Sequence, residues 1–181
     1  LSIGAFGILN RIQMLFVMIV MGIAQGMQPI TGYNFGAERP DRVKLTLKLG
    51  IIAGVAVTTF GFIVGELFPN VFVGMFTDNH ELTAQSETAL RIGILMFPLV
   101  GAQIIICQFF QSIGKAGIAI FLSLSRQLLF LLPGLAILPL HWGVNGVWYS
   151  MPTSDFFAAA AAILMLFYQI RKFKTTAPFA S

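Results

Sequence analysis

The sequence predicts an all-α integral membrane protein with five transmembrane helices. Of its 181 residues, 57% are hydrophobic and only 10% are charged, and the mean hydropathy is +0.86. A soluble domain needs roughly a quarter of its residues charged to cover its surface, so most of this surface must face lipid. A membrane-spanning helix needs about 20 apolar residues. Five apolar stretches are long enough: 3–32, 49–68, 89–113, 118–138 and 147–170.

The first two predicted spans are separated by a polar, basic connection. In the first span, the most uniform apolar part is interrupted only by Gln25 and Gln28. Residues 33–48 hold four basic residues around Pro40, which predicts a loop followed by the start of an amphipathic helix. The second span, 49–68, then returns across the membrane.

The remaining spans follow from the alternation of apolar runs and short connections. Residues 69–87 are polar and acidic, which predicts an extramembrane connection with a capping signal at 77–79. Only residues 114–117 separate the third span from the fourth, so these two spans should be antiparallel neighbours. The connection at 139–146 contains Trp142, a residue favoured at the headgroup level.

The distribution of basic residues predicts the orientation. The successive connections hold four basic residues, then Arg91, then Lys115, then none, and the tail 171–181 holds three. Basic connections stay in the cytoplasm, so the C-terminus should be cytoplasmic and Leu1 should lie outside. The basic residues behind the net charge of +4 therefore set the orientation of the spans in the membrane. For that reason we expect no nucleic-acid partner. An odd number of spans starting outside without a Met predicts further spans before Leu1.

Three charged residues fall within predicted spans, where charge is costly and marks a functional or a paired position. Asp155 lies roughly 12 Å into the fifth span, and Arg11 lies in the outer part of the first. They are candidates for an ion site or for an ion pair with each other, the alternatives being a proton or cation site and a paired carboxylate that fixes helix packing. Arg126 is expected to extend towards the headgroups.

The third span carries a row of polar side chains. Gln103, Cys107 and Gln111 follow at intervals of four residues, with Gln108 beside them, so they share one helical face that must avoid lipid. These residues either line a water-filled substrate cavity or form hydrogen bonds between helices.

Glycines four residues apart predict close helix contacts. The pairs are Gly22 with Gly26, Gly50 with Gly54, and Gly61 with Gly65.

No pattern in the sequence indicates an enzyme or a metal site. The sequence has no Gly-x-Ser-x-Gly elbow, no phosphate-binding loop, no His-Glu-x-x-His and no Cys-x-x-Cys. The single cysteine and two histidines are too scattered for a zinc pattern. We expect no cofactor, and if the protein is a transporter, its energy must come from an ion gradient or from another subunit.

Residues 22–44 closely resemble the eighth span and the following cytoplasmic loop of MATE (multidrug and toxic compound extrusion) transporters. The resemblance lies in the run from Gln25 to Ala37, and the residues that carry the motif are Gln28, Pro29, Gly32, Tyr33, Asn34 and Gly36. The stretches 110–115 and 143–148 agree in order and spacing.

This resemblance implies that the chain covers spans eight to twelve of a twelve-span, two-lobe transporter in the bacterial inner membrane. Such proteins export small organic, often cationic, compounds by antiport with protons or sodium through alternating access. The implied partners are the lipid bilayer and an N-terminal lobe of the same protein. The third span lacks the carboxylate that some sodium-coupled members carry there. A flippase of lipid-linked sugars, with more cationic residues facing its cavity, and a non-transporting membrane scaffold remain alternatives.

Overall fold

The chain forms a bundle of helices. The computed structural model describes residues 2–175, and all regular structure within them is helical, which confirms the predicted fold class. The end of the predicted tail, 176–181, and the side chain of Lys174 lie outside the described residues. In order, the elements are α1 (Ser2–Gly36), α2 (Pro40–Leu67), α3 (Pro69–Gly74), α4 (His80–Gly93), α5 (Phe97–Ser112), α6 (Ala116–Leu124), the π-helix η1 (Ser125–Leu131), α7 (Leu132–Trp142) and α8 (Val144–Thr175).

Within residues 2–175, four helical stretches are long and apolar enough to cross a membrane, and a bent pair of helices could form a fifth span. The four are Ile3–Gly36, Pro40–Leu67, Ala116–Trp142 and Val144–Phe173. The third of them runs through α6, η1 and α7 without a loop. The bent pair consists of α4 and α5, whose axes meet at 55°.

The third predicted span is therefore not one straight helix. Residues 94–96 interrupt it, and α5 begins with Pro98 in its first turn. Proline disfavours helical geometry in the residue before it and cannot donate a hydrogen bond to the preceding turn, so the chain changes direction here. The polar stretch before this span is also largely helical. The side chain of Asn79 caps α4 by accepting hydrogen bonds from the backbone N–H groups of Glu81 and Leu82, as the capping signal predicted.

The loop predicted between the first two spans is much shorter than 33–48. Helix α1 continues to Gly36, α2 begins at Pro40, and only three residues connect them. A proline at the first position of a helix loses no hydrogen bond, so Pro40 starts α2 and does not mark the middle of a loop. Glu38 makes the turn with a positive φ of 54°.

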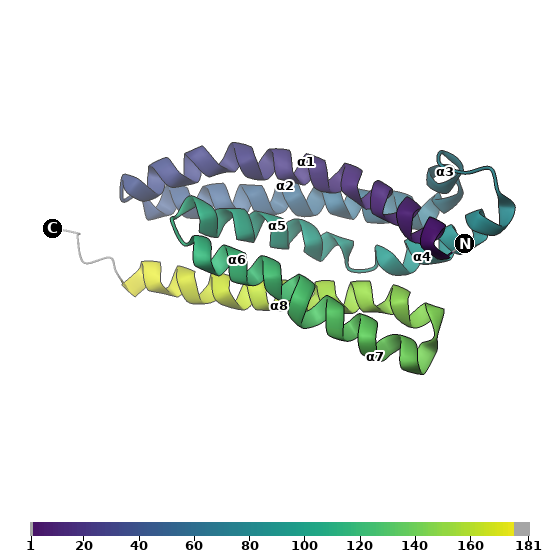
Figure 1. The fold of residues 1–181 in the computed structure, drawn as a ribbon. Coiled ribbons are helices and arrows are strands. Elements are labelled where there is room, and N and C mark those ends of the chain that lie inside the picture. The colour runs from purple at the N-terminus through teal and green to yellow at the C-terminus, as the bar shows by residue number, and fades with distance from the viewer. Residues whose placement is uncertain (1, 176–181) are drawn as a thin grey trace.

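The bundle has two sides that meet at α5. Figure 1 shows α1 and α2 on one side of α5, with α8 and the α6–η1–α7 stretch on the other. The centre of the bundle is filled by side chains of α5, among them Ile105, Phe109 and Phe110, which are fully buried. One end of the bundle holds the α1–α2 turn, the α5–α6 turn and the end of α8 (Figure 1).

Helices α2 and α5 approach until their backbones touch. A Cβ added at Gly101 would lie 2.5 Å from the carbonyl oxygen of Gly54 and would also overlap the hydroxyl oxygen of Thr58. That hydroxyl donates to the carbonyl oxygens of Gly54 (3.0 Å) and Pro98 (3.4 Å). Gly50, Gly54, Gly61 and Gly65 are all buried, whereas Gly22 and Gly26 have open space beside them. Two of the three predicted glycine pairs therefore lie at helix contacts.

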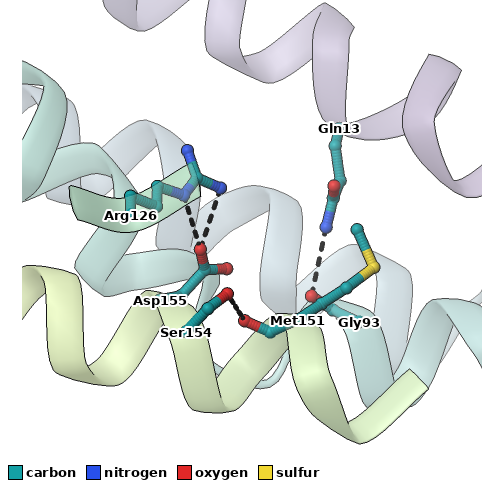
Figure 2. A network of polar contacts seen from close by, with 6 residues as sticks. All are labelled: Gln13, Gly93, Arg126, Met151, Ser154 and Asp155. Carbon is teal, nitrogen blue, oxygen red and sulfur yellow. Dashed lines mark hydrogen bonds and ion pairs between the residues drawn. The ribbon is translucent and has the colours of Figure 1, made fainter. Parts of the chain in front are cut away.

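The break between α4 and α5 leaves a carbonyl that a side chain from α1 satisfies. The amide nitrogen Nε2 of Gln13 donates to the carbonyl oxygen of Gly93 over 3.1 Å (Figure 2). Replacing Gln13 with leucine should lower the free energy of unfolding by about 1–3 kcal/mol, because a partly buried acceptor loses its partner. Thermal unfolding in detergent would measure this loss. Asn10→Leu, at an exposed position one turn earlier, is the control, and equal stability of the two variants would contradict the prediction.

Candidate functional site

An ion pair joins the last two spans inside the bundle. Nε and Nη2 of Arg126, on η1, each lie 2.8 Å from Oδ1 of Asp155, on α8 (Figure 2). The predicted pairing of Asp155 with Arg11 is wrong: Arg11 is exposed on α1, whereas α8 packs against η1. The prediction placed both residues by depth alone. Depth does not specify which helices are neighbours.

The two partners of this pair differ strongly in exposure. The side chain of Asp155 is 5% exposed and that of Arg126 is 39% exposed. Beside Asp155, the hydroxyl of Ser154 donates its hydrogen bond to the backbone carbonyl of Met151 in the same helix, so this hydrogen is not directed at Asp155. Arg126 is thus the charged partner of a buried Asp155, whereas the side chain of Arg126 is itself partly exposed.

Cys107 lies on α5, which also packs against α8. Cys107 is half-buried there. Arg126 and Asp155, which the sequence did not connect, meet where η1 packs against α8. Across residues 2–175, no group of three His, Cys, Asp or Glu side chains is placed to hold a metal ion.

The predicted row on α5 runs from the interior of the bundle to its surface. Gln103 is buried, and its Oε1 has no hydrogen-bond partner. Cys107 is half-buried and Gln111 is exposed. Gln103 consequently does not line a surface of this bundle, and only the end of the row nearest the α5–α6 turn can face a cavity.

A second surface row on α1 joins the exposed end of the α5 row. Nε2 of Gln108 donates to Oε1 of Gln28 over 2.9 Å. Gln25 and Gln28 are exposed on α1, three residues apart, and Gln108 and Gln111 have the same spacing on α5. We call these four residues the amide wall. Gln28 was singled out in the sequence only as part of a loop motif, because the adjacency of α1 and α5 could not be read from it.

The motif residues after Gln28 build the end of α1. The side chain of Asn34 is buried and donates to the carbonyl of Ile30 over 2.8 Å. A Cβ at Gly32 would lie 3.3 Å from the backbone oxygen of Ser112, so this glycine lets α1 approach α5. Pro29 lies inside α1, and Tyr33 is exposed. Gly36 is the last residue of α1, directly before the turn.

A separate cavity of about 450 Å³ lies between α4 and the start of α8. It is lined by Ala84, Gln85, Thr88, Val144, Asn145 and Trp148. None of these residues carries a charge, so the cavity offers no ionic site of its own. No sequence pattern predicted it.

Comparisons with known proteins agree in pointing to one family. The sequence model of the MatE family matches residues 1–135. The multidrug export protein MepA of Staphylococcus aureus (strain MSSA476) is 24% identical over 166 residues, which cover 92% of this chain and 36% of MepA.

Solved structures give the same result. The MATE multidrug transporter DinF-BH is 37% identical, with a TM-score of 0.82 over 90% of this chain and 36% of that one. An inward-facing MATE family transporter of the MOP superfamily is 21% identical, with a TM-score of 0.87 over 96% of this chain and 40% of that one. The chain thus spans less than half the length of these relatives.

Proposed function

Because the chain belongs to the MatE family, we propose that it works as part of the C-terminal lobe of a secondary transporter. The transporter would export small organic, often cationic, compounds by alternating access in exchange for protons or sodium. An N-terminal lobe would complete the central cavity. The proposed location is the bacterial inner membrane.

The amide wall is the observation that carries this proposal. Gln28 lies eight residues before the end of α1, which is about 12 Å along the helix axis, and Gln25 lies deeper still. Amide groups at that depth are costly against lipid tails, so such surfaces face protein or a water-filled cavity. Gln25, Gln28 and Gln111 are exposed and Gln108 is half-buried, so the amide wall supports a polar cavity on this side of α1 and α5.

The chemistry of amides suits a transporter with many substrates. Each glutamine offers two donors and one acceptor oxygen without a fixed charge, so the wall can contact varied ligands and still release them. The flippase alternative gains no support from Arg126, because the guanidinium is directed at Asp155.

The positions of the basic residues support a cytoplasmic C-terminus. Arg39 lies in the α1–α2 turn, Lys115 in the α5–α6 turn and Arg171 near the end of α8, and these three segments lie at one end of the bundle (Figure 1). Basic residues gather on the cytoplasmic side of membrane proteins. We assign this end to the cytoplasm.

Everted membrane vesicles test the proposed transport directly. The complete open reading frame that carries this chain would be expressed in bacteria that lack their own exporters, and uptake of a fluorescent organic cation would be followed under an imposed proton or sodium gradient. We expect gradient-dependent uptake that collapses when the gradient is removed. Uptake equal to that of vesicles without the protein would refute the proposal.

Gln108→Leu should change substrate preference. Loss of one amide contact should alter the relative transport of different organic cations by about fivefold, the effect of roughly 1 kcal/mol from one hydrogen bond. Gln85→Leu on α4, outside the amide wall, is the matched control. If both variants transport a panel of organic cations identically, Gln108 does not contact the substrates.

A further inference from the structure

The ion pair between Arg126 and Asp155 is built so that only one partner can leave it. Asp155 lies eleven residues into α8, about 16 Å from the start of the helix, and is buried on all sides. Arg126 has a long side chain of which more than a third is exposed. An arginine of this kind can move its charge to a polar region at small cost, but the carboxylate cannot follow it.

The contact also leaves part of the carboxylate uncommitted. Both short contacts from Arg126 end on Oδ1, and Oδ2 takes part in neither of them. A side-by-side arrangement in which each nitrogen contacts a different oxygen would be the stronger geometry. Arg126 therefore holds Asp155 through one oxygen, and Oδ2 is the atom that an incoming cation would contact before it displaces Arg126.

Arg126 lies on an unusual part of its helix. It is in the first turn of η1, where the backbone follows a π-helix, and Pro133 follows at the start of α7. Proline removes a backbone donor from the helix, and π-helical turns are rare features that occur frequently at functional sites. The π-helical backbone that carries Arg126 therefore differs from α8, which is α-helical at Asp155 and contains Pro152 one turn earlier.

From these observations we propose that Arg126 is a tethered competitor for a monovalent-cation site at Asp155. In one state the guanidinium neutralises the carboxylate. In the other state Arg126 has moved away, and a proton or a sodium ion takes its place. This inference rests on the proposed transport function and names the residues at which its coupling cation would bind.

The two states exclude each other on electrostatic grounds. A carboxylate buried in the membrane is stable only when its charge is balanced or removed, so Asp155 needs Arg126 or another cation. Two cations at one carboxylate would leave an excess positive charge in the same buried place. Binding of the coupling cation would therefore release Arg126, and return of Arg126 would expel the cation.

Few other titratable groups lie on the helices around this site. Helix α5 contributes Cys107, and α6 contributes none. Helix α7 has only His141, near its far end. The titratable residues of α4, which also packs against α8, are His80, Glu81, Glu87 and Arg91.

Cation titration of transport tests the competition. In vesicles containing the complete transporter, Arg126→Gln should lower the half-saturating concentration of the coupling cation by about tenfold. In the wild type, Arg126 occupies Asp155 in most molecules, and the apparent affinity for the cation is reduced by the fraction of molecules whose site is free. Sodium would be titrated at fixed pH, and protons in sodium-free buffer, to identify the cation. The exposed Arg11→Gln is the matched control.

The remaining variants separate the possible outcomes. Arg126→Lys keeps the tethered charge and should stay near the wild-type value, whereas Asp155→Asn and the double variant should lose the dependence on the cation. An unchanged half-saturating concentration in Arg126→Gln would overturn the competition. No gradient-driven transport by the wild type would instead refute the proposed function.

A binding measurement covers the case in which Arg126→Gln does not fold. The thermal stability of the purified wild type in detergent should rise with sodium or proton concentration, and that rise should be absent in Asp155→Asn. The same rise in both proteins would overturn the site at Asp155. This readout does not depend on transport.

Discussion

Replacing Gly101 with valine is expected to abolish the accumulation of folded protein. The first added carbon would already lie 2.5 Å from the carbonyl oxygen of Gly54, and that oxygen belongs to a backbone that cannot turn aside as a side chain can. Overpacking of a well-packed core typically costs about 1–3 kcal/mol and occasionally more. A β-branched side chain against helix backbone should exceed that range, because neither backbone can move aside without separating the two helices. Fluorescence-detected size-exclusion chromatography of a tagged protein would measure the folded fraction.

Gly22→Val provides the matched control for Gly101. Gly22 is also a glycine within a membrane-spanning helix, and open space surrounds the position of its missing Cβ. We expect the control to yield a normal monodisperse peak. A normal peak from Gly101→Val as well would mean that α2 and α5 can separate at little cost.

Replacing Arg126 with leucine should destabilise the protein by about 3–5 kcal/mol, the usual cost of leaving one partner of a buried ion pair uncompensated. Asp155→Leu should cost less, because the abandoned arginine is partly exposed and can reach a polar region. The double replacement should recover most of the loss, since no buried charge remains. Thermal unfolding in sodium-free detergent at neutral pH would rank the three variants.

The order of the single variants is the critical result. Equal losses for Arg126→Leu and Asp155→Leu would show that exposure of the arginine does not matter. A double variant less stable than Arg126→Leu alone would show that the side chains contribute shape or volume to the packing beyond their charges.

Hydropathy predicts the spanning helices of this protein well and the direction of their backbone poorly. The apolar run 89–113 continues without a polar interruption through residues 94–96, where the structure bends by 55°, so composition alone cannot locate the break. Pro98 was the available signal, but a proline can kink a helix or begin one. Pro40 posed the same ambiguity, and there the basic residues around it favoured a loop.

Contacts between helices were the other part that the sequence left open. Gln28 and Gln108 were recognised separately, but their hydrogen bond depends on α1 lying beside α5. Arg126 and Asp155 had a usable signal: they lie on the two sides of the short connection 139–146, and a short connection makes its two spans antiparallel neighbours. The proposed pairing of Asp155 with Arg11 rested on depth and did not use this adjacency.

The backbone contact at Gly54 and Gly101 restricts how the bundle can deform. Two helices whose backbones touch, and which share a hydroxyl between the carbonyls of Gly54 and Pro98, cannot slide along each other without collision. Movement within packed structures instead occurs at hinges or between bodies that stay rigid. Helices α2 and α5 should therefore move together as a single rigid body during any conformational cycle. Sliding between helices must then occur at helix pairs that are packed less closely, and bending can occur at the break before α5.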